Sequence, residues 1–278
     1  MFITGKISKI ENKIDEFGKI DYFLFLDEKK IFLNNLLGKY ISLEHIKNLI
    51  FCIGCQKKMK AWYRNNYCFL CNKKLAICDI CIIKPEKCHF HLNTCREPEW
   101  GWKYCMNIHY VYLSITSGAK IGITKKKNLI FRWINQGAIQ GLLIAKCLNR
   151  RIAGLYENYL TKYIADKTNW RKMLSNIINF SDLKEIRDQI IWRSQKSLFL
   201  QKFFNEKSIL ILKNEKIQNL IYPIINYPEK IQLFHFKKKL KISGILTGIK
   251  GQYLLFNNTV INLRKHLGYK IHFYQNSL

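Results

Sequence analysis

Nine of the ten cysteines in this 278-residue chain lie between Cys52 and Cys105, and this clustering constrains the fold more than any other feature. The motif Cys52-x2-Cys55 is followed, after twelve residues, by Cys68-x2-Cys71. Each Cys-x-x-Cys turn presents two thiolates with the spacing of two corners of a tetrahedron around Zn²⁺, and two turns complete the shell. The spacing therefore predicts a zinc-ribbon-like module with a structural zinc on these four thiolates. An iron–sulfur cluster and reactive thiols remain alternatives.

A second group of metal-ligand residues follows the first. Within 32 residues the chain carries Cys78, Cys81, Cys88, His89, His91, Cys95, Cys105 and His109. We expect a second zinc with Cys78 and Cys81 as its first pair. We assign Cys88 and His91 as the other two ligands, although any of the remaining cysteines and histidines in the group could take their place. Cys147 stands alone and is interpreted as an ordinary buried thiol.

The surroundings of these cysteines favour metal ligation over disulfides. The chain begins Met1-Phe2-Ile3-Thr4-Gly5-Lys6, which is not an apolar leader, and no run approaches the ~20 apolar residues of a spanning helix. Disulfide frameworks belong mainly to small exported chains. We therefore expect a cytoplasmic protein with reduced, metal-binding cysteines and no membrane partner.

The charge of the chain points to a polyanionic partner. The formal net charge is +28, from 47 Lys and Arg against 19 Asp and Glu. Residues 1–51 are nearly neutral, with eight basic and seven acidic side chains, so the excess lies beyond them. A field of this sign favours phosphate-backbone contacts. We expect nucleic acid as the partner, with a solvated Lys-rich surface, an acidic protein or membrane lipid as alternatives. No small-molecule cofactor is inferred.

The pattern of apolar residues divides the chain into five segments and predicts an α+β fold. Residues 229–278 and 1–51 read as small β-modules, the latter with β-rich stretches at 22–26 and 30–33. Residues 52–109 form the zinc-binding module, and residues 110–175 alternate strand and helix patterns. Residues 176–228 read as a helical connector, with one amphipathic helix from Asp182 to about Phe204.

The two β-modules resemble each other in sequence. The stretch Tyr22–Leu26, Ile31–Asn34, Leu37–Ile41 matches Tyr253–Phe256, Val260–Asn262, Leu267–Ile271. Each is preceded by a Gly-x-x-x-x-Ile stretch, at Gly5 and at Gly244. We interpret them as related modules that pair into one small barrel or sandwich and bring the chain ends together. Coincidence in Ile-, Leu- and Lys-rich sequence is the alternative.

Residues 110–175 predict a hairpin, a helix, a strand and a second helix. The strands are expected at 110–116, 119–124 and 141–148, and the helices at 128–136 and 151–164. The first helix carries Arg132 and the second carries Glu157. Glu157 and Asp166 are the two acidic residues among twelve basic ones in 111–175, so Glu157 is either a metal ligand or a salt-bridge partner.

Over about sixty residues this segment resembles the GIY-YIG nuclease superfamily. Val111-Tyr112-Leu113 stands where that family has its first motif, and Lys120-Ile121-Gly122 stands where it has Tyr-Ile-Gly. Arg132, Glu157 and Asn169 fall where the family has its catalytic Arg, its metal-binding Glu and a late Asn. The first motif lacks its glycine and shifts the tyrosine, which leaves Tyr110 as a second candidate. The second motif has Lys120 in place of tyrosine.

The resemblance implies a phosphodiesterase that uses Mg²⁺ or Mn²⁺. Tyr112 would orient or deprotonate water, Arg132 would clamp the phosphate, and Glu157 would hold the divalent ion. Lys120 would stabilise an oxyanion, and Asn169 would complete the catalytic set. Basic runs near these positions are expected to contact DNA or RNA: Lys125, Lys126, Lys127, Arg150, Arg151, Arg171 and Lys172.

We therefore predict a zinc-containing nucleic-acid-binding protein with endonuclease-like activity. The first alternative is a catalytically inactive RNA- or ribosome-binding protein that keeps the nuclease-like fold. The second is an RNA-modifying enzyme that uses a zinc-held thiolate, which would require a zinc with three protein ligands and an open fourth position.

Overall fold

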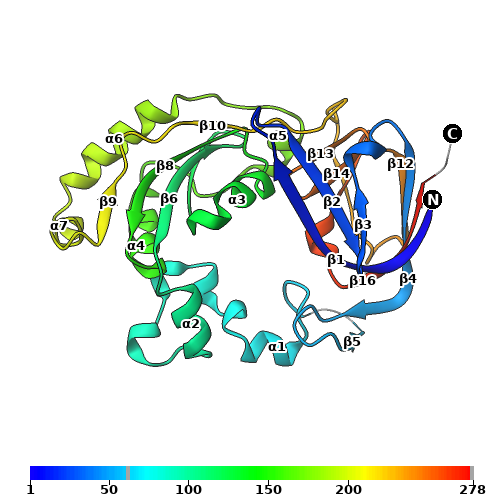
Figure 1. The fold of residues 1–278 in the computed structure, drawn as a ribbon, viewed down its shortest axis with the longest axis horizontal. Coiled ribbons are helices and arrows are strands. Elements are labelled where there is room, and N and C mark those ends of the chain that lie inside the picture. Colours follow the sequence, from blue (N-terminus) through cyan, green and yellow to red (C-terminus); the bar gives the residue numbers. More distant parts are fainter. Residues whose placement is uncertain (61–62, 276–278) are drawn as a thin grey trace. The chain divides into compact units, whose positions relative to one another are not determined.

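The computed structural model describes residues 1–60 and 63–275 (Figure 1). Residues 61–62 of the predicted zinc module and 276–278 of the predicted C-terminal module lie outside the described part. The chain divides into two compact units. Unit 1 comprises Met1–Asn72, Leu174–Ile177 and Leu220–Leu278, and unit 2 comprises Lys73–Met173 and Ile178–Asn219. Both helices and strands build the fold, so the predicted α+β class is confirmed.

Unit 1 is built on a seven-stranded sheet with the order β12-β4-β16-β1-β2-β3, in which β5 pairs with β4. Alternation with a period of two explains these strands, since Ile20, Tyr22, Leu24 and Leu26 of β2 are buried and the residues between them are not. The strands are β1 (Phe2–Ile14), β2 (Ile20–Leu26), β3 (Lys29–Phe32), β4 (Tyr40–Phe51), β5 (Lys58–Met59), β12 (Lys241–Ile245) and β16 (Tyr269–Gln275).

The two ends of the chain pair in this sheet. β1 runs antiparallel to β16, with Phe2 opposite Tyr274, and the amino group of Met1 donates to the carbonyl of Gln275 at 2.8 Å. β12 pairs in turn with β4. A second, four-stranded sheet has the order β11-β15-β14-β13, with the strands β11 (Gln232–Phe234), β13 (Gly248–Lys250), β14 (Tyr253–Phe256) and β15 (Thr259–Asn262).

The sequence similarity of the two β-modules extends to their structure. Each has a hairpin with a two-residue turn, β2–β3 and β14–β15, whose first turn residue has a positive φ: 52° at Asp27 and 47° at Asn257. Asp and Asn tolerate this conformation. Each hairpin leads into a 3₁₀ turn, Asn34–Leu36 or Leu263–His266, then a glycine with positive φ, then a long strand, β4 or β16. The same elements therefore occur in the same order at both ends.

Unit 2 contains a five-stranded sheet with the order β10-β8-β6-β7, in which β9 pairs with β8. The strands are β6 (His109–Ile115), β7 (Ala119–Thr124), β8 (Gln140–Cys147), β9 (Ile209–Ile211) and β10 (Gln218–Asn219). Its helices are α2 (Pro98–Tyr104), α3 (Leu129–Asn135), α4 (Arg150–Leu160), most of α5 (Trp170–Leu174), α6 (Leu183–Gln195) and α7 (Leu198–Asn205), whereas most of α1 (Phe69–Lys74) belongs to unit 1.

The predicted order of hairpin, helix, strand and helix in residues 110–164 is confirmed by β6, β7, α3, β8 and α4. Two helix boundaries were wrong. The second helix ends at Leu160, and residues 161–163 form a turn. The single helix predicted over 182–204 is two helices, because the chain breaks at Ser197, whose extended backbone precedes α7. Serine favours such a helix start over a helix interior.

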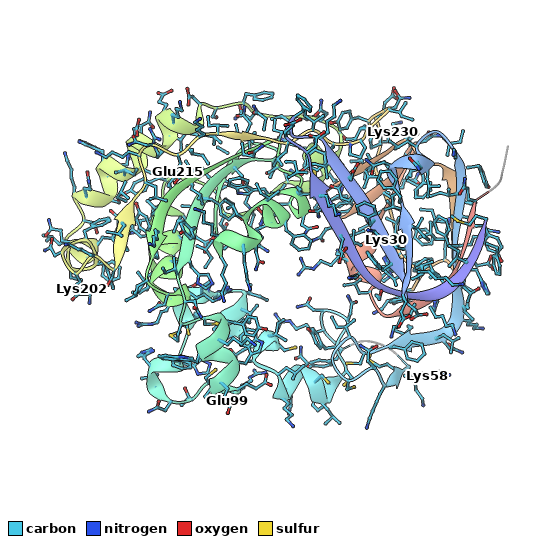
Figure 2. The ribbon with its side chains drawn as sticks, viewed as in Figure 1. Lys30, Lys58, Glu99, Lys202, Glu215 and Lys230 are labelled. Carbon is cyan, nitrogen blue, oxygen red and sulfur yellow. The ribbon has the colours of Figure 1, made fainter. Side chains whose placement is uncertain are left out.

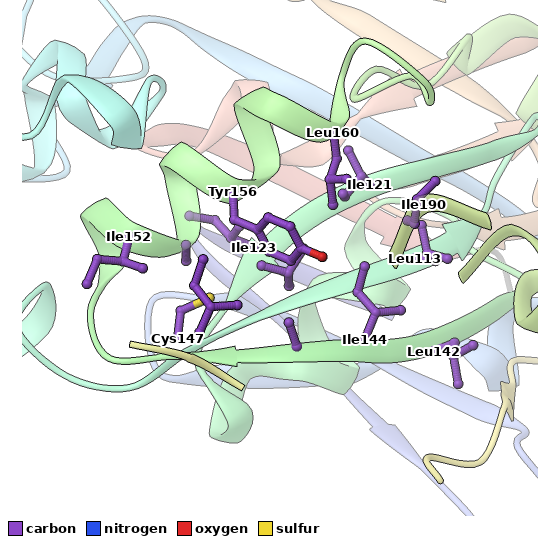
Figure 3. Close-up of a cluster of buried hydrophobic side chains, with 14 of the residues drawn as sticks. Leu113, Ile121, Ile123, Leu142, Ile144, Cys147, Ile152, Tyr156, Leu160 and Ile190 are labelled. Atoms are coloured by element: carbon purple, nitrogen blue, oxygen red, sulfur yellow. The ribbon is translucent and has the colours of Figure 1, made fainter. Parts of the chain in front are cut away.

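The hydrophobic core of unit 2 lies between its sheet and helices. Val111 and Leu113 of β6 pack with residues of α4, α6 and α7. Figure 3 shows Ile152, Tyr156 and Leu160 of α4 pointing toward the strands that carry Ile123 and Ile144. Cys147 is fully buried in this cluster, as expected of an ordinary buried thiol. No helix in the described residues is both long enough and apolar enough to cross a membrane.

Candidate functional site

The four cysteines of the first predicted metal site lie together in unit 1. Cys52 and Cys55 follow directly on β4, whereas Cys68 precedes α1 and Cys71 lies within it. All four Sγ atoms lie within 4.8 Å of one another. In a tetrahedral site with Zn–S bonds of about 2.3 Å the sulfur atoms lie about 3.8 Å apart. The cluster could hold a metal ion such as zinc, and its four thiolates would leave no open coordination position.

Backbone hydrogen bonds prepare this cluster for thiolates. The N–H of Cys68 donates to Cys52 Sγ at 3.2 Å, and the N–H of Cys71 donates to Cys68 Sγ at 3.4 Å. Burial raises the pKa of Cys52, but hydrogen bonds from the backbone of Cys55, Cys68 and Gly54 outweigh it and lower the pKa to about 6. N–H donors aimed at a sulfur stabilise its anionic form.

The second predicted ligand set is only partly brought together. Cys81 and Cys88 line a common small cavity in unit 2. Cys78 and His91 are not among the residues that line this cavity. Cys95 and Cys105, which sequence reasoning left as open alternatives, line it instead.

Four of the five predicted catalytic residues interact in unit 2. Tyr112 lies on β6, Lys120 on β7, Arg132 on α3 and Glu157 on α4, so four elements converge. Glu157 interacts electrostatically with Arg132, Lys120, Asp166 and Arg150. The side chains of Glu157 and Lys120 form no hydrogen bond and no ion pair with another residue in the described part of the chain. The carboxylate therefore faces cations without being neutralised by direct contact.

Burial controls the protonation of this cluster. Burial raises the pKa of Glu157 from 4.5 to about 7, against the opposing charges of Arg132 and Lys120. Burial and the charge of Arg132 lower the pKa of Lys120 from 10.5 to about 8. Both side chains are thus poised to change charge near neutral pH, a property that is frequent at functional sites.

Tyr112 is fully buried beside this cluster and interacts with Arg132. Its hydroxyl donates to Gln136 Oε1 at 2.9 Å and interacts with Arg132. Its ring lies over Gly122, where a Cβ would overlap the hydroxyl and Cζ, so only glycine fits there. Burial raises the pKa of Tyr112. Sequence reasoning missed Gln136, because a glutamine just after a helix carries no sequence signal of its role.

Asn169, the fifth predicted catalytic residue, immediately precedes α5 (Trp170–Leu174) in unit 2. Its Oδ1 accepts from the backbone N–H of Lys172 at 3.2 Å, and its own N–H donates to Ser117 Oγ at 3.1 Å. The Asn169 side chain therefore accepts from the first turn of the short helix α5.

Asn169 and Lys172 line an open groove of about 750 Å³ in unit 2. Four cationic side chains line this groove, which we call the basic groove, and its described lining residues include no carboxylate. The guanidinium of Arg193 stacks on Tyr163, with Cζ 5.0 Å from the ring centroid. Its cationic residues are Lys162, Lys167, Lys172 and Arg193. Sequence reasoning identified one of the four, because the others are isolated in sequence and meet only in the fold.

The predicted nucleic-acid-binding residues divide into exposed and engaged side chains. Lys126, Lys127, Arg171 and Lys172 are exposed, and Arg171 stacks on Trp170. The remaining three are partly buried: Lys125, Arg150 and Arg151. Lys125 Nζ donates to the carbonyl of Lys103 at 3.2 Å, and Arg150 Nη2 donates to that of Ile82 at 2.6 Å. Exposed lysines also occur outside these runs, such as Lys30 on β3 and Lys202 on α7 (Figure 2).

Comparisons with known proteins place the chain in one family. Neither the curated proteins nor the solved structures include a match. The model of one family, described as a protein of unknown function (DUF2797), matches residues 38–271. The matched range covers most of the chain and includes the cysteine cluster, the Glu157 cluster and the basic groove. The chain therefore belongs to the DUF2797 family.

Proposed function

We propose that this protein binds nucleic acid and cleaves phosphodiester bonds with the help of a divalent metal ion. The observation that carries the proposal is the half-buried carboxylate of Glu157, which lies amid Arg132, Lys120 and Arg150 without a direct partner among the described residues. Phosphodiester hydrolysis needs cations at the phosphate and a carboxylate that can hold a hard metal ion.

The residues present fit one divalent ion. Mg²⁺ or Mn²⁺ commonly takes one or two carboxylates and keeps several waters, and Glu157 is a suitable first ligand with Asp166 nearby. When bound, the ion would polarise the phosphate and a coordinated water. The remaining chemistry belongs to the protein. Arg132 is exposed and planar, so it can hold two phosphate oxygens, and the buried ammonium of Lys120 can stabilise negative charge on a third.

We assign different roles to the two tyrosines of β6. Tyr112 is 0% exposed, and its hydroxyl is bound to Gln136, so we assign it the positioning of Arg132. Tyr110 is half-buried and is the better candidate to accept a proton from water. The basic groove would bind the phosphates of the same nucleic acid, since its cations are not paired with carboxylates among its lining residues.

The test compares the wild type with Glu157→Gln on labelled DNA and RNA. Both proteins are assayed with Mg²⁺ or Mn²⁺ and in metal-depleted buffer, because EDTA would also strip zinc. We expect metal-dependent cleavage that falls by at least about 100-fold in the variant, as when a catalytic group is lost. Glu206→Gln, an exposed carboxylate of the same unit, is the matched control and should keep wild-type activity. Equal cleavage by Glu157→Gln and the wild type would contradict the proposal.

The burial of Tyr112 favours a second candidate function. Because Tyr112 is fully buried, its hydroxyl is enclosed within the protein. This is the arrangement expected of a nuclease-like fold that has lost its catalytic activity. In that case the protein binds RNA or ribosomes through the basic groove. Tight, salt-sensitive binding by the wild type and by Glu157→Gln, without cleavage by either, would establish this candidate.

A further inference from the structure

We propose that Cys81, Cys88, Cys95 and Cys105 form a second four-thiolate zinc site, in unit 2. The four cysteines line one cavity of about 10 Å³. A cavity of this size has room for about one small atom or water. The ligand set differs from the pairing of Cys78 and Cys81 that the sequence suggested. The inference rests on these residues alone and does not depend on the proposed function.

The thiols approach this cavity from separate short elements. Cys81 lies in the 3₁₀ turn Ile80–Ile82 and forms a hydrogen bond with Cys88, which follows the turn Pro85–Lys87. Cys105 follows the last residue of α2, is 5% exposed and interacts electrostatically with Cys88 and Cys95. The Sγ of Cys95 lies 3.0 Å from the position of a Cβ at Gly101, so α2 packs closely against it.

The segment that carries these cysteines has little else to hold it together. Residues 76–105 consist of four 3₁₀ turns and α2, and their large apolar side chains are mostly exposed: Ile77, Ile80, Ile83, Leu92, Trp102 and Tyr104. Small modules without an apolar core generally need a disulfide or a metal to fold. All four cysteines are free, so a metal ion is the available cross-link.

A buried cation supports the assignment independently. Arg150 interacts electrostatically with Cys81 and Cys105, and its Nη2 donates to the carbonyl of Ile82 within the module. Its Nε is buried without a hydrogen-bond partner in the described part of the chain. Four thiolates on Zn²⁺ carry a net charge of −2, and a thiolate could accept the orphaned N–H. Such outer partners commonly tune a metal site.

The competing ligands near the cavity are already engaged. Near this cavity, the group whose ligand atoms all lie within 4.8 Å of one another in the described residues is Asp79, Cys81 and His89, and the sulfur atoms of the four cysteines do not meet that limit together. However, the carboxylate of Asp79 forms an ion pair with Arg96 at 2.6 Å and accepts from the N–H of Cys81 at 3.1 Å. His89 Nδ1 lies 2.7 Å from Thr94 Oγ1, and its Nε2 faces Asp79 at 3.6 Å. These groups stabilise the turn around the thiols, which leaves sulfur as the ligand.

The proposed second zinc site would connect residues 76–105 to α4, the helix that carries Glu157. Pro85 and Glu86, between Cys81 and Cys88, pack on Gly154 of α4 so closely that a Cβ at Gly154 would lie 2.5 Å from Pro85. Arg150 begins the same helix. A zinc that fixes the loop from Cys81 to Cys105 would therefore also fix α4.

The experiment counts zinc in the purified full-length protein by elemental analysis. We expect two zinc ions per chain in the wild type and one in each of Cys95→Ser and Cys105→Ser. Cys78→Ser is the matched control and should keep both. One zinc per chain in the wild type would overturn the proposal, as would loss of a zinc from Cys78→Ser with retention of both in Cys95→Ser.

A second measurement uses the wild type and so does not depend on the variants folding. The zinc is exchanged for ¹¹³Cd²⁺, and the cadmium NMR spectrum is recorded. Two resonances at chemical shifts typical of tetrathiolate coordination are expected. A single tetrathiolate resonance, or a second resonance shifted to the range of mixed sulfur and nitrogen ligands, would contradict the four-cysteine assignment.

Discussion

The backbone N–H of Gly38 donates to the carbonyl of Leu246 at 2.9 Å, which ties the first β-module to the second. The reciprocal bond, also 2.9 Å, runs from Gly268 to Ile7. In the sequence similarity of the two modules, Gly38 corresponds to Gly268 and Ile7 to Leu246. The internal similarity therefore corresponds to an exchange of equivalent hydrogen bonds between the two halves of unit 1.

The two glycines should respond differently to substitution. Both have a positive φ, 77° at Gly38 and 87° at Gly268, so alanine costs about 1–2 kcal/mol at either site. A Cβ at Gly268 would also overlap the carbonyl oxygen of Phe51, whereas at Gly38 it would lie 3.7 Å from Ile225. We expect Gly268→Ala to lower the free energy of unfolding by at least about 3 kcal/mol. Urea denaturation checks this, and equal effects of the two substitutions would contradict it.

His266 occupies the position in the second β-module that Leu36 occupies in the first. Because its imidazole is buried, it makes the stability of unit 1 sensitive to acid. Both residues are buried, and His266 Nε2 accepts from the N–H of Phe236 at 3.3 Å. Burial lowers the pKa of His266 from 6.5 to about 3; the hydrogen bond with the Asn262 backbone opposes this shift, and the charges of His235, Lys265 and His45 add to it. The folded state therefore holds His266 neutral.

The linked stability is fully present above the unfolded pKa of about 6.5 and is lost as the pH falls toward 3. His266→Leu copies Leu36 and removes this dependence. Relative to the variant, we expect the wild type to lose about 1 kcal/mol of unfolding free energy per pH unit between pH 6 and 4. Denaturation of both proteins over this range checks the prediction. Parallel pH profiles would contradict it.

Lys250 is a buried amine that destabilises unit 1. It is 0% exposed, and its Nζ has no hydrogen-bond partner in the described residues, although it lies 5.0 Å from the ring centroid of Tyr227. Burial lowers the pKa of Lys250 from 10.5 to about 8. The folded state thus binds fewer protons, and stability rises as the pH increases from about 8 to 10.5.

Replacement of Lys250 by methionine removes the buried charge and keeps most of the volume. We expect Lys250→Met to raise the free energy of unfolding by about 2–3 kcal/mol at pH 7, with a smaller gain at pH 9.5. Chemical denaturation at the two pH values measures both quantities. A variant that is less stable than the wild type at pH 7 would show that the aromatic contacts of the ammonium outweigh its desolvation.

The first metal site can be tested by substitution of Cys55. This side chain is exposed, so its replacement disturbs no buried apolar packing. We expect Cys55→Ser to bind one zinc fewer than the wild type and to melt at a lower temperature. In a protein of this size a loss of about 2 kcal/mol shifts the midpoint by about 4–8 °C. Added zinc should restore the melting temperature of the chelator-treated wild type and leave that of the variant unchanged, and calorimetry measures both. Unchanged zinc content in the variant would exclude Cys55 as a ligand.

The basic groove predicts how nucleic-acid affinity depends on salt. Each neutralised phosphate contributes a log–log slope of about 0.9 on duplex DNA. Lys167→Gln and Arg193→Gln should each weaken binding and reduce the slope by about 1, whereas Lys202→Gln, exposed on α7 and outside the groove, should change neither. Fluorescence anisotropy at several salt concentrations measures both. Equal slopes for all variants would place the nucleic acid elsewhere.

Local patterns in the sequence predicted the elements whose formation depends on near neighbours. The spacing of Cys52, Cys55, Cys68 and Cys71 was enough to predict a common site, because each pair shares one turn. Short apolar runs bounded by turn residues were enough to predict β6, β7 and β8, because such runs are typical of buried strands. The break at Ser197 was missed, because the apolar spacing continues across it.

The sequence by itself determined the first cysteine cluster, the α+β class and the order of elements around Arg132 and Glu157. Only the tertiary structure decided that Tyr112 is enclosed and that Cys95 and Cys105 line one cavity with Cys81 and Cys88. The basic groove likewise exists only in the fold. The physical reason is that each of these depends on contacts between elements far apart in the chain, whereas periodicity and motif spacing report only on residues that share a turn, a helix or a strand.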